Sequence, residues 1–459
     1  MDVQQVNSRA IHEQQHDTEQ QNESNDAPGI GPAAGANQDG GQVEKQATAV
    51  SSASYEETYP EGGWAAWIVV LGSFFALFSA MGLMNSIAIF QAYTLDHQLK
   101  GYSEGTVGWI FSIYTFLAFF GGVYFGPIFD MYGPRWLLVS GCICITVAMV
   151  GMSFCTQLWQ FILSFGILGG LGTSLIFTPS IAAVGHWFKA RRGFATGVAS
   201  CAGGLGGIIY PLMLTDLFDR IGYGWSTRVV ALISLVCSLI AVVLVRSRLP
   251  PAKNATAHPD ARIFRQIPFA LTTIGIFLLE FSLFIPLAYI STYAIHKGFS
   301  QEYAYHLIPI MNAGSVVGRA LPGYYSDVIG AFNTCLLSVA VSLVACFCVW
   351  LPLGHTSAGI IIFSLLFGFA SGTGIAIAPV CIGRMCKTQE YGRYYATTYT
   401  VVSFACLIGI PIAGSIVQAN NGSYQQLIIF TGCIYLGAGG FLIWAKAAKV
   451  GWKNCFSAY

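Results

Sequence analysis

Two ionisable residues stand alone within long apolar stretches of the chain. Arg319 lies in the segment SVVGRALPG, and Glu280 lies in GIFLLEFSLFIPLAYIS. A charged side chain in membrane hydrocarbon costs at least about 3 kcal/mol, so it normally faces a protein interior or a cavity and serves binding or proton transfer. We expect Arg319 to bind an anionic or polar substrate, and Glu280 to handle a proton or the substrate.

Two structural alternatives remain open at this point. Arg319 and Glu280 could form a purely structural pair, or a protonated Glu280 could hydrogen-bond between helices. Phe111 and Tyr114 offer aromatic surface, or they pack in the core. The remaining polar and aromatic residues that we expect around a binding site are Asn85, Asn312, Ser315, Tyr289 and Tyr293.

Composition separates a membrane-embedded part of the chain, where such a site would lie, from a polar N-terminal segment. Of the 459 residues, 54% are hydrophobic and 9% are charged, whereas a soluble domain carries roughly a quarter charged residues. Residues 1–59 differ, because they contain ten Asp or Glu, two Lys or Arg, and no Leu, Phe or Trp. Such a segment buries too little apolar surface to fold, so we expect a disordered acidic tail in the cytosol.

From Trp64 onward, apolar runs recur at the length that a helix needs to cross a membrane. We therefore expect an all-α membrane protein with twelve transmembrane helices. The expected spans are 64–91, 106–129, 136–155, 158–182, 194–217, 227–245, 267–294, 304–326, 332–351, 357–383, 394–418 and 427–445.

Basic residues predict the orientation of these helices. With the N-terminus inside, fifteen Lys and Arg fall in cytoplasmic loops and the C-terminal tail, and four fall outside. This asymmetry follows the positive-inside rule. We expect a multi-pass protein of the plasma membrane with both termini in the cytosol.

The depth of Arg319 follows from this topology. Asp327 marks the cytoplasmic end of its span, and eight residues at 1.5 Å each place Arg319 roughly 12 Å deep. Half the hydrocarbon thickness is about 15 Å, so a surface position is not expected.

The chain also repeats itself. GPIFDMYGPR begins at Gly126 and GYYSDVIGAF begins at Gly323, a shift of 197 residues, and the position that matches Arg319 is Gly122. FGILGGLGT and FGFASGTGI repeat with a shift of 202. Two halves of like sequence indicate a parallel repeat about an axis along the membrane normal. The expected parts are a tail (1–59), two six-helix bundles (60–246 and 266–446), a cytosolic linker (247–265) and a C-terminal tail (447–459).

This arrangement resembles the major facilitator superfamily, in which the loop after the second span reads roughly G-x-x-x-D-R-x-G-R-[RK]. Met131 stands where the family usually has an arginine, which weakens the expected charge relay. The resemblance implies a cytoplasmic gate in each half. Its residues here are Gly126, Asp130, Gly133 and Arg135, and, in the second half, Gly323, Asp327 and Gly330.

The segment GRALPG at 318–323, together with the long acidic tail, resembles fungal members of the monocarboxylate porter branch. Two further segments resemble this branch as a whole. They are PEGGWAAW, at 60–67, and WFKARRGFATGVASCAGG, at 187–204. The basic run before the fifth span is interpreted as a set of topology anchors; these are Lys189, Arg191 and Arg192. Arg319 matches the branch's arginine, but Ser315 and Asn85 stand where the branch has an aspartate and a lysine, which argues against simple lactate-type proton symport.

The expected function is secondary active transport of a small organic compound by alternating access. We favour efflux of an organic anion or secondary metabolite; the alternatives are import of a monocarboxylate or vitamin, and a non-transporting nutrient sensor on the same fold. No G-x-x-x-x-G-K-[ST] segment occurs, which argues against an ATP-driven pump. We expect no enzymatic activity, metal or cofactor, and no nucleic-acid partner. Expected partners are the substrate, the lipid bilayer and, as a candidate coupling ion, the proton; the chain is expected to be a monomer.

Overall fold

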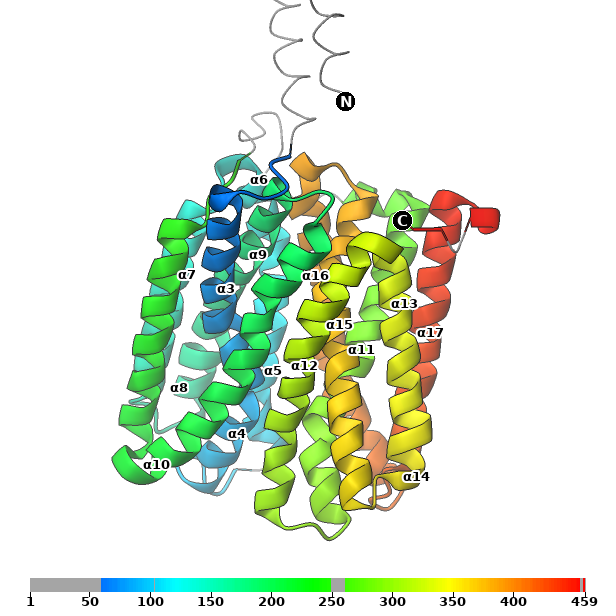
Figure 1. Cartoon of the computed structure of the whole chain (residues 1–459). Coiled ribbons are helices and arrows are strands. Elements are labelled where there is room, and N and C mark those ends of the chain that lie inside the picture. Colours follow the sequence, from blue (N-terminus) through cyan, green and yellow to red (C-terminus); the bar gives the residue numbers. More distant parts are fainter. Residues whose placement is uncertain (1–58, 103, 249–260, 455–456, 459) are drawn as a thin grey trace, which may run out of the picture. The chain divides into compact units, whose positions relative to one another are not determined.

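The computed structural model describes residues 59–102, 104–248, 261–454 and 457–458, which form a bundle of long helices (Figure 1). The expected disordered tail, apart from Tyr59, lies outside the described residues, as does the middle of the expected linker, 249–260.

The first half of the bundle is built from α-helices and a π-helix. Its elements are α3 (Trp64–Asn85), α4 (Ile87–Asp96), α5 (Glu104–Phe120), α6 (Gly122–Tyr132), α7 (Arg135–Met152), α8 (Leu158–Phe161), the π-helix η1 (Ile162–Gly169), α9 (Gly170–Trp187) and α10 (Arg192–Leu244).

The second half begins with a short 3-10 helix. Its elements are η2 (Ala261–Arg265), α11 (Ile267–His296), α12 (Gln301–Ile329), α13 (Ala331–Val344), the π-helix η3 (Ala345–Trp350), α14 (Leu351–Leu353), α15 (Ser357–Met385), η4 (Thr388–Glu390), α16 (Tyr391–Ala419), α17 (Gln425–Val450) and η5 (Trp452–Asn454).

These elements account for the twelve predicted spans. Ten helical segments in the described part are long and apolar enough to cross a membrane. One of them, α10, has 53 residues and turns back at Gly222, whose φ of 76° is a left-handed value that favours glycine, so it makes two crossings. The twelfth is α12, which has 29 residues and runs the length of the bundle although it carries Arg319 (Figure 1).

The first span differs from the expected continuous helix over 64–91. The helix is interrupted at Ser86 and then continues as α4 to Asp96. The Ser86 hydroxyl donates a hydrogen bond of 2.7 Å to the carbonyl of Gly82, four residues earlier. Hydroxyl groups bonded back to the preceding turn bend helices, which gives a physical reason for the break.

A proline inside α10 leaves one backbone carbonyl to be completed by the other half. Pro211 has no N–H, so the carbonyl of Gly207 loses its usual donor. In lipid no water replaces that donor. The side-chain amide of Asn312 in α12 donates to the Gly207 carbonyl at 3.2 Å, so a side chain of one half completes the backbone of the other.

The same solution appears between α12 and α15. Pro322 removes the donor for the Gly318 carbonyl, and the Thr373 hydroxyl donates to that carbonyl at 2.9 Å. The two helices approach so closely that a Cβ added to Gly368 would lie 2.9 Å from the carbonyl carbon of Met311. Small residues permit such backbone contact between membrane helices.

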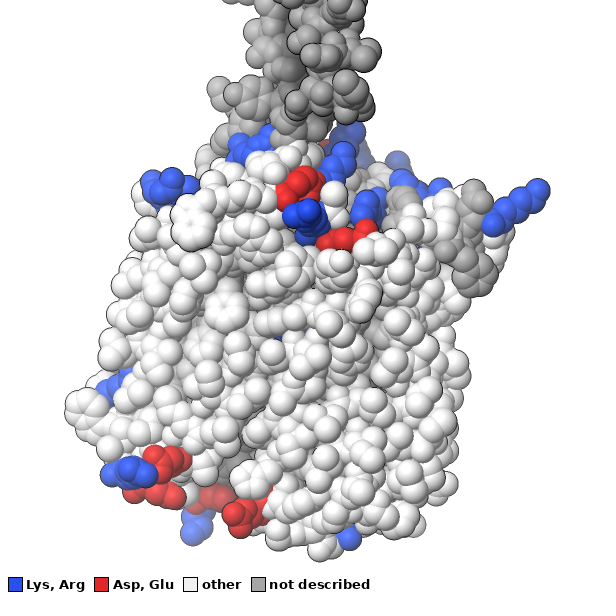
Figure 2. Space-filling view, in the orientation of Figure 1, with Lys and Arg blue, Asp and Glu red and all other residues white. Residues whose placement is uncertain are grey.

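Charge is distributed unevenly over the bundle (Figure 2). Lys and Arg gather at the end where α3 and α10 begin and where α6 and α17 finish, and a broad uncharged band follows. We call this end the basic face. The opposite face contains the turn at Gly222. The uncharged band is what lipid-exposed helices require.

The close packing of α12 on α15 predicts the effect of one methyl group. Gly368→Ala should destabilise the protein by about 1–3 kcal/mol, because the Met311 backbone must move away. Thermal unfolding of the purified protein in detergent measures this. Gly440→Ala is the control, since Gly440 lies in α17 with no atom within 4 Å of an added Cβ; an equal loss of stability in both variants would contradict the prediction.

Candidate functional site

A cavity of about 240 Å³ lies between the two halves and contains most of the predicted binding residues. It extends from Arg319 towards the opposite face, where it reaches Gly108 in the first turns of α5 and Ile308 in α12. Its polar lining consists of Asn85, Gln91, Ser112, Thr115, Tyr289, Thr292, Asn312, Ser315, Arg319 and Ser371.

Arg319 is the cationic member of this lining, and its exposed fraction is 2%. Its Nη1 donates to the carbonyl of Ser200 in α10 at 2.7 Å, and its Nε donates to the Ser315 hydroxyl at 3.2 Å. No carboxylate among the described residues forms an ion pair with it. The structural pair with Glu280 is therefore not formed in this structure, and the guanidinium beside the cavity has no countercharge in contact.

Asn85 and Asn312 lie at the cavity in different halves, and the side-chain amide of each donates to a backbone carbonyl of α10. The Asn85 amide donates to the Gly203 carbonyl of α10 at 2.8 Å, as the Asn312 amide does to Gly207. Both residues line the cavity together with Ser315. The structure thus brings three predicted residues to Arg319, and two of them, Asn85 and Asn312, hydrogen-bond to the backbone of α10.

Glu280 lies outside the cavity lining, with an exposed fraction of 2%. Arg319 is the charged group that acts on it electrostatically, and no described residue donates a hydrogen bond to its carboxyl group. A buried carboxyl without a donor is costly in hydrocarbon. Its placement leaves proton handling, rather than direct ligand contact, as the role to test.

Tyr289 lines the cavity, whereas Tyr293, one turn later in α11, lies outside its lining. The Tyr289 hydroxyl donates to the Ile410 carbonyl at 3.1 Å. The Tyr293 ring instead packs edge-on against Trp350 and Tyr424, at 5.5 Å from each ring centroid. These aromatic partners hold it towards the opposite face.

Several lining residues were not predicted from the sequence. Ser112 and Thr115 are three residues apart in α5, on the helix face that also carries Phe111. Their spacing was a usable signal, because hydroxyls and an aromatic on one face of an apolar helix favour a ligand-facing surface. Gln91 and Ser371 carry no comparable pattern.

At the basic face, the predicted gate acid of the first half contacts the second half. The Asp130 carboxylate accepts hydrogen bonds from the backbone N–H groups of Gly392, at 3.1 Å, and Arg393, at 2.9 Å. These groups belong to the first turn of α16, where N–H groups lack helical partners and the helix dipole favours an anion.

Asp327 repeats this contact in the other direction. Its carboxylate accepts from the N–H groups of Gly193, at 2.8 Å, and Phe194, at 2.9 Å, in the first turn of α10. Each half of the protein therefore caps the start of a helix in the other half with a carboxylate. The carboxylate of Asp130 is buried and that of Asp327 is half-buried.

Glycines bring these contacts into range. A Cβ on Gly126 would collide with the Gly392 carbonyl, and one on Gly323 would lie 2.7 Å from the Gly193 carbonyl oxygen. Two further gate glycines, Gly133 and Gly330, end α6 and α12 with φ of 78° and 94°, values that favour glycine.

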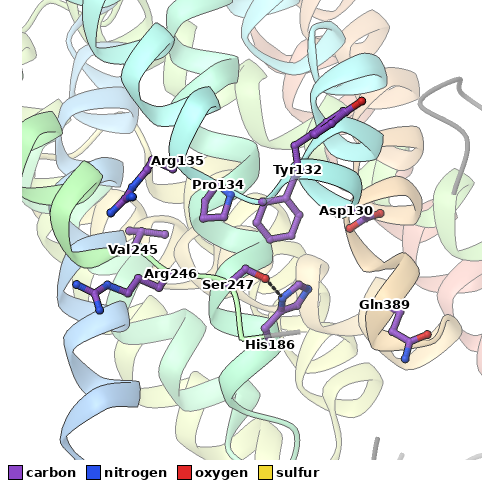
Figure 3. Close-up of a pocket in the computed structure, with 11 residues that line it drawn as sticks. Asp130, Tyr132, Pro134, Arg135, His186, Val245, Arg246, Ser247 and Gln389 are labelled. Carbon is purple, nitrogen blue, oxygen red and sulfur yellow. Dashed lines mark hydrogen bonds between the residues drawn. The ribbon is translucent and has the colours of Figure 1, made fainter. Parts of the chain in front are cut away.

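Arg135 does not meet the gate acid. It lies with Arg246 on one side of a hollow of about 480 Å³, and Asp130 and Gln389 lie on the other (Figure 3). His186 contributes to the hollow between them, and its Nδ1 is 2.8 Å from the Ser247 hydroxyl. With Met131 in place of the family's arginine, Asp130 uses backbone partners rather than a charge relay.

The three predicted anchors are placed in different surroundings. Lys189 and Arg191 are exposed, and their backbone N–H groups donate to the Glu61 carboxylate at 2.8 and 3.0 Å. Arg192 is buried and stacks on the Tyr391 ring of the other half. Its position is therefore not that of a lipid-facing anchor.

Sequence comparison agrees with this architecture. The sequence model of the Major Facilitator Superfamily matches residues 67–410. The chain belongs to this superfamily of membrane transporters. It is 38% identical over 387 residues to MFS-type transporter 1 of Ophiocordyceps sp., covering 84% of this chain and 86% of the relative. It is also 35% identical over 392 residues to the aspyridones efflux protein apdF of Emericella nidulans, covering 85% and 79%.

Solved structures of this superfamily share the fold. The human organic anion transporter MFSD10 superposes with a TM-score of 0.65 at 16% identity, covering 82% of this chain and 98% of that structure. The transporter FucP in its outward conformation gives the same TM-score and coverage at 14% identity. At such identities the likeness extends to the fold alone.

The two carboxylate caps predict a local effect on each helix start. Asp130→Asn should accelerate hydrogen exchange at the start of α16, and Asp327→Asn at the start of α10, each by about 10-fold, since a partly buried charge at a helix end contributes up to about 2 kcal/mol. Hydrogen–deuterium exchange of the detergent-purified protein measures this. Asp219→Asn, at an exposed residue of α10, should change neither segment; equal acceleration in all three variants would reject the caps.

Proposed function

We propose that this protein is a secondary active transporter that exports a small organic anion or secondary metabolite by alternating access. The observation that carries the proposal is Arg319, a buried guanidinium beside a cavity between the halves, with which no carboxylate of the described residues forms an ion pair. A ligand anion supplies the missing countercharge there, in surroundings where electrostatic attraction is stronger than in water.

The cavity walls favour a ligand with an apolar body. Phe111, Phe284, Leu287 and Ile375 line it together with the amides and hydroxyls near Arg319. Ligand sites of this kind combine apolar walls with a small number of polar groups that fix orientation. We place the chain in the monocarboxylate-porter-like branch, with a cargo larger than lactate because Ser315 and Asn85 replace two ionisable residues of that branch.

The names of relatives support export. Besides the aspyridones efflux protein, the fujikurins efflux protein of Gibberella fujikuroi is 32% identical over 406 residues. Import is a second candidate, because the riboflavin transporter MCH5 of Saccharomyces cerevisiae is 32% identical over 421 residues.

We further propose that the basic face is cytoplasmic, in line with the positive-inside rule, and that the protein works as a monomer in the plasma membrane with both termini in the cytosol. The halves comprise residues 60–246 and 266–446, with 247–265 as the linker. The cavity then opens towards the outside, and the paired acids Asp130 and Asp327 close the cytoplasmic side.

Comparison of metabolites inside and outside cells with and without the gene identifies the cargo. For that compound, Arg319→Ala and Arg319→Lys should each reduce transport at least about 100-fold, because removal or misplacement of a buried charge partner costs about 3 kcal/mol or more. Surface expression is the control. Unchanged transport by either well-expressed variant would reject Arg319 as the binding residue.

Glu280→Gln tests proton coupling separately. If Glu280 carries the coupled proton, the variant should retain exchange of labelled against unlabelled cargo in proteoliposomes but lose transport driven by a pH gradient. Asp219→Asn should retain both. Gradient-driven transport by Glu280→Gln at the original rate would reject a coupling role.

A further inference from the structure

A buried cation that the proposed transport site does not use lies at the cytoplasmic end of the bundle. Arg192 is the first residue of α10, and its exposed fraction is 7%. No carboxylate among the described residues forms an ion pair with it. A buried charge without an anion requires another source of stabilisation.

The Tyr391 ring, at the start of α16, supplies that stabilisation. The guanidinium carbon of Arg192 lies 3.8 Å from the centroid of this ring, within the range of a cation–π contact. Tyr391 is itself held in place, because its hydroxyl donates to the Pro379 carbonyl at 3.0 Å. The ring and the guanidinium come from different halves of the protein.

Two glycines leave the space that the guanidinium fills. A Cβ on Gly185, near the end of α9, would lie 2.8 Å from the guanidinium carbon, and a Cβ on Gly383, near the end of α15, would lie 2.6 Å from it. Neither position accepts a side chain while Arg192 is in place. The guanidinium of Arg192 therefore lies between α9 of the first half and α15 of the second half.

These four residues are related by the internal repeat. Gly185 and Gly383 are 198 positions apart, and Arg192 and Tyr391 are 199 apart, which lies between the shifts of 197 and 202 of the two repeated motifs. Equivalent positions of two halves meet each other at the pseudo-twofold axis. Arg192 thus lies where the halves touch on that axis, between the two carboxylate caps.

We propose that Arg192 is a central latch of the cytoplasmic gate, held closed by its stacking on Tyr391. The inference rests on the proposed alternating access, in which the starts of α10 and α16 separate. Asp130 and Asp327 bind backbone N–H groups, whereas Arg192 binds the face of an aromatic ring, which stabilises contact along the axis. When the halves separate, water reaches the guanidinium and replaces the ring.

Cysteine alkylation at Thr178 tests the latch without knowledge of the cargo. Thr178 is buried in α9, beside Gly122 of α6, and does not line the outward cavity. Thr178→Cys is introduced, and its labelling by a membrane-impermeant maleimide is followed in inside-out vesicles, relative to the parent protein. Arg192→Gln should raise the labelling rate by about 10- to 30-fold, as expected for loss of a desolvated cation–π contact. Arg191→Gln, at the exposed neighbour, should leave it unchanged.

The Tyr391 variants separate a latch from a general structural role. Tyr391→Leu should raise labelling as Arg192→Gln does, and the double variant should add little to either. Tyr391→Phe keeps the ring face and should remain close to the parent. Unchanged labelling in folded Arg192→Gln, or in Tyr391→Leu if the former does not fold, would overturn the proposal. So would equal increases in Tyr391→Leu and Tyr391→Phe. Failure to find an exported compound would leave these labelling results standing.

Discussion

Polar groups within membrane hydrocarbon must find their partners inside the protein, and here much of that demand converges on one helix. The backbone carbonyls of α10 accept hydrogen bonds from Asn85, Asn312 and Arg319. Two of these donors come from the other half. The polar residues of the cavity and the contact between the halves are therefore parts of one hydrogen-bonded arrangement, and neither changes without the other.

The basic face is closed by contacts of a different kind. Asp130 and Asp327 each bind the start of a helix in the opposite half, at nearly equivalent positions of the repeat. Backbone N–H groups are present in any sequence, so this closure tolerates the loss of the family's arginine at Met131. Arg192 adds a side-chain contact on the axis. There the equivalent positions of the two halves carry unlike residues, Arg192 and Tyr391, which contact each other.

The helix count and the equivalent positions of Asp130 and Asp327 at helix ends followed from sequence, because apolar length and a repeated motif can be read directly from the residues. Partners were less predictable. Nothing local to Arg192 showed that its guanidinium reaches Tyr391, 199 positions away. For a related reason, the sequence does not show that the Tyr293 ring packs on Trp350 rather than lining the cavity.

The bond between Asn312 and Gly207 has a mechanical consequence. Pro211 leaves that carbonyl dependent on a side chain that also faces the cavity. A cargo that draws the Asn312 amide to itself removes the carbonyl's donor and makes α10 more compliant at this point. A cargo bound in this way would therefore couple occupation of the cavity to the bending stiffness of α10.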